Sequence, residues 1–153
     1  MAVIEAPLSR YKKNNLLIWI VLLVGLGAWF AYDGYKSPEF IKKHTLEDGQ
    51  PDSTLLFNRR APIVMAGAAI AIGIYLFLIK DKKLIADENA LHADKLEIPY
   101  ARIESINKTY FDKKGYFLLT YKDDHQQVQE LKLSDRTYDN LGVLLDTLIS
   151  KIS

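Results

Sequence analysis

The sequence predicts a membrane α-helical hairpin joined to a small α+β domain. Residues 16–32 and 61–79 are long apolar runs without any Asp, Glu, Lys or Arg, which predicts two transmembrane helices. From residue 83 the apolar residues alternate as in strands, and near the C-terminus they recur at helical spacing. We therefore expect a curved antiparallel sheet of about five or six strands with one C-terminal helix.

The predicted segments follow one another with little linker between them. In order they are a cytoplasmic N-terminal tail (1–14), transmembrane helix 1 (15–33), an extracytoplasmic loop with a short helix (34–60), transmembrane helix 2 (61–79) and a soluble domain (80–153). Residues 80–153 hold 12 basic and 13 acidic side chains, so this domain lacks the basic footprint of a nucleic-acid binder. The chain has no cysteine, which excludes disulfides, thiolate metal sites and cysteine nucleophiles.

Both apolar runs approach the thickness of a bilayer. As helices they would extend about 25 Å and 28 Å, against a hydrocarbon core of about 30 Å. Tryptophan and tyrosine near the ends of the first run, at Trp19, Trp29, Tyr32 and Tyr35, are typical of an aromatic belt. Pro62 is expected in the first turn of the second helix, where its missing N–H costs little.

Two other interpretations of the apolar runs are less favoured. A buried helix of a globular core rarely runs this long without a polar face. A cleavable signal peptide has a shorter apolar region, and no clean small-x-small cleavage site precedes Asp33. Because no ionisable residue lies within either run, we expect an anchor and not a transporter.

Small residues four positions apart predict close helix packing. The pairs are Gly27 with Ala31, Gly67 with Ala71, and Ala69 with Gly73. Packing of the two helices on each other is the favoured interpretation, and packing against a second copy or a partner subunit is the alternative.

Basic residues predict the orientation. Six flank the hairpin on the side of the two termini, against five in the connecting loop. The positive-inside rule then places both termini and the soluble domain in the cytoplasm, in a multi-pass protein of the inner (plasma) membrane. Within the loop, Ser37, Pro38 and Glu39 predict the start of a short helix that continues to about His44.

The soluble domain reads as strands followed by a helix. Strands are expected over 83–87, 90–93, 96–100, 116–121 and 126–133, a hairpin turn over 113–115, and a further apolar segment within 101–110. Val128, Leu131 and Leu133 are candidates for a buried face. Ser134 or Asp135 would cap a helix whose apolar stripe is Tyr138, Leu141, Leu145, Leu148 and Ile152.

Three stretches of residues 61–153 carry a family resemblance. They are LIADENAL at 84–91, IPYARIESI at 98–106 and YDNLGVLLDTL at 138–148. With two transmembrane helices ahead of them, the chain resembles bacterial membrane-anchored proteins that carry a pleckstrin-homology-like (PH-like) domain. The resemblance implies a curved antiparallel sheet closed by one C-terminal helix, and it brings no catalytic residues. This chain is short for that pattern, so part of the first sheet is expected to be missing.

The sequence indicates interaction more than chemistry. It contains no phosphate-binding glycine loop, nucleophile elbow or zinc-binding helix motif, so no enzyme activity, cofactor or metal is expected. A basic and aromatic segment could contact anionic lipid or a partner, through Lys108, Tyr110, Phe111, Lys113 and Lys114. The expected function is a membrane-anchored module that binds a protein, a peptide or the lipid surface. Its partners would be membrane lipid and either another protein or a second copy, and the alternative is an accessory subunit of a larger membrane complex.

Overall fold

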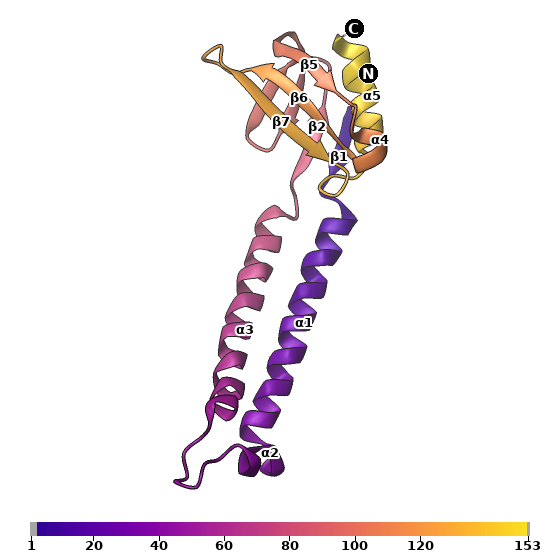
Figure 1. The fold of residues 1–153 in the computed structure, drawn as a ribbon. Helices are drawn as coiled ribbons and strands as arrows, with labels where there is room; N and C mark the ends of the chain where they lie inside the picture. The colour runs from indigo at the N-terminus through magenta and orange to yellow at the C-terminus, as the bar shows by residue number, and fades with distance from the viewer. Residues whose placement is uncertain (1–2, 153) are drawn as a thin grey trace. The chain divides into compact units, whose positions relative to one another are not determined.

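The computed structural model describes residues 3–152, and the chain forms two compact units (Figure 1). One unit is the helical hairpin, residues 14–78. The other, which we call the domain, combines the segment up to Lys13 with residues 79–153. The N-terminal segment is therefore part of the domain although the hairpin separates the two in sequence.

The two long helices extend well beyond the apolar runs. Helix α1 spans Arg10–Tyr35 and helix α3 spans Ser53–Ile79. The reason is capping: the Ser9 hydroxyl accepts from Lys12 N–H (3.1 Å), and the Asp52 carboxylate accepts from Leu55 N–H (2.8 Å). The predicted place of Pro62 was therefore wrong, because this proline lies inside α3 and not in its first turn.

Both helices are long and apolar enough to cross a membrane. Within their most apolar 18-residue windows, none of α1 and only 11% of α3 is buried by the rest of the chain. A core helix of a soluble protein would be mostly buried, whereas most of the apolar surface of these helices is left uncovered by the described chain.

Helices α1 and α3 approach closely where glycine removes a side chain. A Cβ on Gly34 would lie 3.0 Å from the carbonyl oxygen of Asn58, and one on Gly27 would lie 3.5 Å from Cβ of Met65. Asn58 stands four residues before Pro62, which has no N–H to bond that carbonyl within the helix. Close approach at Gly34 thus coincides with the carbonyl that Pro62 leaves without its helical donor.

Polar and aromatic contacts reinforce the same end of the hairpin. Arg59 Nε donates to the Gly34 carbonyl (2.9 Å), and the guanidinium lies 5.6 Å from the centre of the Tyr35 ring. Phe30 and Phe57 pack edge to face with ring centres 5.5 Å apart. The expected packing of the two helices on each other is therefore concentrated near the connecting loop.

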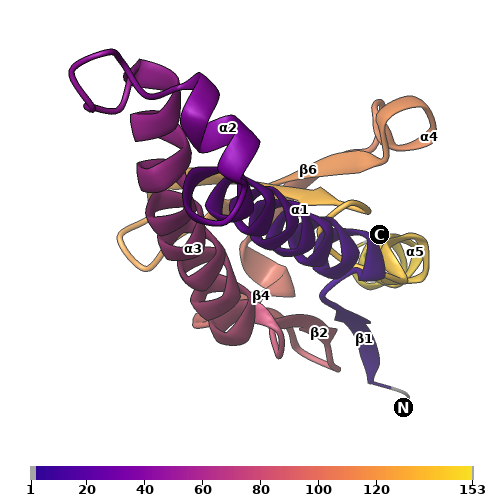
Figure 2. The same ribbon diagram turned by 90° about the horizontal axis from the view of Figure 1, so that it is seen from below.

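The connecting loop contains the predicted short helix. Helix α2 spans Pro38–Lys43, and Ser37 caps it by accepting from Phe40 N–H (3.4 Å) (Figures 1 and 2). Beyond it, His44 Nδ1 lies 2.8 Å from the Asp52 carboxylate. The hydrogen bond from Leu55 N–H, followed by that from His44, lowers the pKa of Asp52. Asp52 thus closes the loop and starts α3.

The domain holds seven described strands in two antiparallel sheets, where a single curved sheet was expected. The first sheet is β1 (Ile4–Pro7), β2 (Lys83–Ala86), β3 (Ala90–Ala93) and β4 (Leu96–Pro99), paired in that order. A 3-10 turn, η1 (Tyr100–Arg102), leads into the second sheet, which is β5 (Ile103–Asn107), β6 (Tyr116–Lys122) and β7 (Val128–Ser134). Residues 80–153 supply six of the seven strands, in agreement with the predicted number.

The seventh strand comes from the segment predicted as a tail. Strand β1 pairs antiparallel with β2, from Ile4 opposite Ala86 to Pro7 opposite Lys83. Ala6 is fully buried, and Lys83 Nζ lies 2.7 Å from the Glu5 carboxylate across the pair. The first sheet therefore has one strand that precedes the hairpin in sequence and three that follow it (Figure 1).

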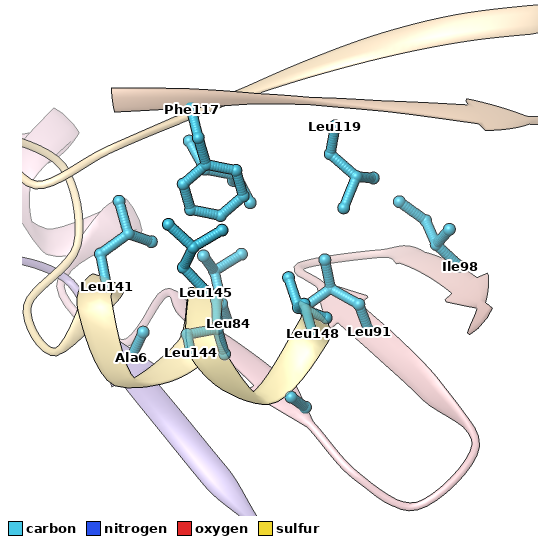
Figure 3. Close-up of a cluster of buried hydrophobic side chains, with 12 residues drawn as sticks. Ala6, Leu84, Leu91, Ile98, Phe117, Leu119, Leu141, Leu144, Leu145 and Leu148 are labelled. Atoms are coloured by element: carbon cyan, nitrogen blue, oxygen red, sulfur yellow. The ribbon is translucent and has the colours of Figure 1, made fainter. Parts of the chain in front are cut away.

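The C-terminal helix closes the core between the sheets. Helix α5 spans Leu141–Ile152, and its buried leucines point toward Phe117 and Leu119 of β6 (Figure 3). The rest of this cluster is Ala6, Leu84, Ala86, Leu91, Ile98 and Leu133. These side chains come from both sheets and from β1, so one core holds the whole domain together.

The predicted start of this helix at Ser134 or Asp135 was wrong. Residues 135–140 instead bind the N-terminal segment: Ser9 N–H donates to the Thr137 carbonyl (2.8 Å), and Asp139 N–H donates to the Pro7 carbonyl (2.9 Å). One helical turn does form, since Tyr138 N–H donates to the Ser134 carbonyl (2.9 Å), but the helix does not continue because the Thr137 carbonyl and the Asp139 N–H are bonded to the N-terminal segment. Tyr138 therefore lies before the helix, opposite Leu8.

Two smaller predictions were also wrong. Residues 113–115 do not form a simple hairpin turn, because Phe111–Lys114 form the one-turn helix α4 and Gly115 ends it with φ of 69°. Val128 is 59% exposed, since strand alternation places it on the face opposite Leu131 and Leu133.

The turn between β2 and β3 joins two of the motifs behind the family resemblance. Asp87 Oδ1 accepts from the N–H groups of Asn89 and Ala90, both at 2.8 Å, and Oδ2 lies 2.7 Å from His92 Nε2. These bonds, the two backbone ones first, lower the pKa of Asp87 to about 2. The Tyr100 hydroxyl donates to the Asp87 carbonyl (2.7 Å), so the 84–91 and 98–106 segments are held together.

Replacing Ala6 by Asp tests whether β1 is part of the core. The substitution would bury a carboxylate without a partner, and we expect it to destabilise the domain by about 3 kcal/mol or more. Hydrogen exchange of the full chain in detergent should show loss of protection at the β2 and β3 amides. Glu5→Gln, on the exposed face of the same strand, is the control. Equal protection in both variants would mean that residues 4–7 are not a core strand.

Replacing Gly34 by Ala tests the close helix contact. The added Cβ would meet the Asn58 backbone at 3.0–3.1 Å, and overpacking of this kind costs about 1–3 kcal/mol. We expect a lower midpoint of thermal unfolding in detergent. Gly67→Ala is the matched control, because nothing lies within 4 Å of a Cβ there and alanine favours the helix. A lower midpoint in the control alone would contradict the assigned contact.

Candidate functional site

The five residues proposed for lipid or partner contact do not form one site. Lys108 faces a cavity of about 470 Å³ beside α5, lined also by Asp112, Gly142 and Asp146. Lys113 and Lys114 line a different cavity of about 340 Å³ at the end of β7. The structure therefore separates Lys108 from the two lysines of α4.

Phe111 has a structural position. Its ring packs edge to face on Phe117 with centres 6.0 Å apart and belongs to the margin of the domain core. The neighbouring Tyr110 is exposed and stacks on Tyr116, with ring centres 5.3 Å apart and an interplanar angle of 21°. Of the two aromatic residues, Tyr110 is the one that can contribute to a surface.

The second cavity brings four cationic side chains together, and we call it the basic groove. Its lining residues are Lys113, Lys114, Tyr116, Lys132, Ser134 and Arg136. Strand register explains part of this set: Tyr116 pairs with Ser134 and Leu118 with Lys132, so these residues share the sheet face opposite Phe117 and Leu133. Helix α4 and the segment after β7 add the other cations.

Tyrosine rings hold two of the lysines in place. Lys132 Nζ lies 4.0 Å from the centre of the Tyr116 ring, and Lys114 Nζ lies 5.1 Å from the centre of the Tyr110 ring. Both distances are within the range of cation–π attraction. Because the two rings also stack on each other, the four side chains form one ordered row at the edge of the groove.

The groove is electrostatically unbalanced. Among residues 3–152, no ion pair involves Lys113, Lys114, Lys132 or Arg136. Other cations of the domain do have carboxylate partners, as in Lys82 with Asp94 (2.9 Å) and Lys122 with Glu104 (2.9 Å). Asp135 contributes a carboxylate beside the groove, where it lies over Gly115. An anion would compensate the remaining positive charge.

Sequence reasoning found Lys113 and Lys114 but missed Lys132, Ser134, Tyr116 and Arg136. Strand alternation carried a usable signal, since Lys132 and Ser134 are two apart and fall on the same face. Pairing of β6 with β7 was needed to bring Tyr116 opposite Ser134. Arg136 lies in the segment predicted as helix, and its place depends on pairing with the N-terminal residues.

The small residues of the helices are also divided. Gly27 packs against α3 and Ala69 is buried, whereas Gly67 and Ala71 are exposed. Ala31 and Gly73 are partly exposed, and nothing lies within 4 Å of a Cβ on Gly73. The hairpin thus leaves the Gly67 and Ala71 pair on its surface.

Neither a metal-binding cluster among the described residues nor a known relative points to a second site. Within the part of the chain that the structure describes, no three or more His, Cys, Asp or Glu side chains come together to hold a metal. No protein-family model, curated protein or solved structure matches this chain. The basic groove is therefore the feature from which a binding function can be argued.

Replacing Gly115 by Ala tests how the groove is positioned. The left-handed backbone at this glycine costs about 1–2 kcal/mol for a residue with a Cβ, and that Cβ would lie 2.1 Å from Asp135 Oδ2. We expect a lower unfolding free energy of the full chain in denaturant, followed by tyrosine fluorescence. Adding Asp135→Ala should relieve the clash and restore that part of the unfolding free energy, while the cost of the left-handed backbone should remain. The single variant Asp135→Ala is the reference. A single variant as stable as the parent would contradict this geometry.

Proposed function

We propose that this chain is a non-enzymatic, membrane-anchored interaction module in which two transmembrane helices hold a PH-like domain at the membrane surface. The observation that carries the proposal is that the domain is joined to both ends of the hairpin. Two residues separate β1 from α1, and three separate α3 from β2. Fully extended, these connections reach roughly 11 Å and 14 Å. Tethers this short keep the domain beside the headgroups wherever the helices cross.

The PH-like assignment within this proposal is supported by the layout of the domain. Its described residues form two antiparallel sheets followed by one C-terminal helix whose leucines enter the core. The contact between Tyr100 and the Asp87 carbonyl links two of the three motifs on which the resemblance depends. In this proposal the motifs contribute to the fold of the domain through this contact and the core around it.

Anchoring is supported by the composition of the helices. Residues 16–32 and 61–79 contain no ionisable acid or base of the kind that marks an ion path. We further propose that both termini face the cytoplasm of a cell whose inner membrane holds the hairpin. Basic residues at the terminal side of the helices support this orientation, among them Arg10, Lys12 and Lys13 before the first run and Lys80, Lys82 and Lys83 after the second.

A second candidate is an accessory subunit of a larger membrane complex. It is favoured by one observation, the exposed pair of Gly67 and Ala71 on α3. Small residues at this spacing let another helix approach closely in lipid. In this case the hairpin would dock a partner and the domain would be carried with it.

Membrane topology can be tested directly because the chain has no cysteine. Single substitutions Glu47→Cys in the loop and Lys95→Cys in the domain would be labelled with a membrane-impermeant maleimide in cells whose outer layers have been removed. We expect labelling of residue 47 in cells stripped of their outer layers, and of residue 95 only after permeabilisation. The reverse pattern would overturn the orientation, and release of the chain by alkaline carbonate would overturn anchoring.

The two candidate functions differ in the mass of the native particle. Purified in mild detergent, an interaction module should be recovered alone or as a self-associated species. A defined complex with a different membrane protein would favour the accessory subunit. Gly67→Leu should disrupt that complex, while Ile63→Leu, at an exposed position without a small residue, should not.

A further inference from the structure

We propose that the basic groove binds the phosphate of an anionic phospholipid headgroup, with Lys113, Lys114, Lys132 and Arg136 as its cationic ligands. This inference deepens the proposed function and rests on it, because the lipid is reached only by a domain that is anchored at the membrane. It names the class of ligand and four cations, two of which the sequence did not single out.

The charge of the groove favours an anionic ligand. Four cations surround one cavity of about 340 Å³, and no ion pair of the described residues involves any of them. Cations in this arrangement repel one another until an anion enters. Phosphate suits them well, since a guanidinium can bind two of its oxygens at once and ammonium groups act as point charges. Asp135 and Asp112 are the acidic side chains nearest in sequence, and neither is paired with these cations.

Several groups of the groove are held in position before a ligand binds. Cation–π contacts on Tyr116 and Tyr110 restrict Lys132 and Lys114 before any ligand binds. The Arg136 backbone is fixed as well, because its carbonyl accepts a 2.5 Å hydrogen bond from the buried Ser9 hydroxyl. Side chains that are already positioned lose less entropy on binding. The groove is therefore better prepared for an anion than a set of free surface lysines would be.

The place of Ser9 in the sequence favours a lipid as the source of the phosphate. The Ser9 hydroxyl that holds Arg136 also caps α1 by accepting from Lys12 N–H (3.1 Å). The uncharged run of that helix begins at Leu16, seven residues on, or about 10 Å at helical rise. A headgroup layer is about 5–8 Å thick on each side of the hydrocarbon core. Because the residue that holds Arg136 is only seven positions from the uncharged run, the phosphates of the lipid headgroups are the anions concentrated nearest to this part of the chain, and we take one of them as the ligand.

The experiment uses the full chain in a neutral detergent. Binding of short-chain phosphatidylglycerol, short-chain phosphatidylcholine and inorganic phosphate would be measured by titration of tyrosine fluorescence, to which Tyr110 and Tyr116 contribute. We expect saturable binding of phosphatidylglycerol, at least about tenfold weaker in Lys132→Gln with Arg136→Gln. Lys95→Gln with Lys108→Gln removes the same charge outside the groove and should leave the affinity unchanged.

Each other outcome would overturn the proposal in a distinct way. Equal loss in both double variants would reduce the effect to net charge, and equal binding of phosphatidylcholine would remove the preference for an anionic lipid. Inorganic phosphate that binds as tightly as phosphatidylglycerol would make free phosphate the ligand. Circular dichroism of each variant shows whether the fold is kept. If the double variant Lys132→Gln with Arg136→Gln unfolds, the double variant Lys113→Gln with Lys114→Gln is used in its place. If the chain binds no phosphatidylglycerol but resists extraction by alkaline carbonate, this inference alone is wrong. If alkaline carbonate releases the chain, the proposed function is wrong.

Discussion

The pairing of β1 with β2 is the constraint on which the rest of the structure depends. It joins residues 4–7 to residues 83–86, so the two ends of the hairpin are fastened to each other inside the domain. The same N-terminal segment continues through Leu8 and Ser9, whose backbone groups bind the residues before α5. One short stretch thereby fixes the first sheet, the approach to the C-terminal helix and the cap of α1.

The order of the basic groove follows from that constraint. Arg136 occupies its position because residues 135–140 pair with the N-terminal segment instead of forming helix. Lys132 and Ser134 are placed by the register of β6 with β7, which is independent of the hairpin. The groove therefore combines a part set by the second sheet with a part set by β1, and its cations converge only when both are formed.

Local patterns in the sequence were sufficient for elements with strong periodicity or caps. The uncharged runs indicated both long helices, Ser37 and Pro38 indicated α2, and alternating residues indicated β2, β3, β6 and much of β7. What failed depended on partners distant in sequence. Strand β1 has four residues and ends in proline, so its identity comes from β2, almost eighty residues later. The start of α5 was predicted too early because Ser134 and Asp135 are good caps. The backbone groups that follow them form hydrogen bonds with the N-terminal segment, and α5 begins only at Leu141. The same reason explains why Lys113 and Lys114 were identified as a contact surface while Arg136 was not.

The pairing of β1 also has a consequence for biosynthesis. The ribosome produces β1 first, and its partner emerges only after both long helices have been made. During that interval the sheet cannot be completed, and Ala6 has no core to enter. In the membrane hairpin that we propose, a chain whose second helix failed to insert would hold its two strands on opposite sides of the bilayer, and β1 could not pair with β2. Under that proposal, pairing of β1 with β2 would require correct insertion of both helices, and a chain in which insertion fails would expose an unpaired β1 to proteases.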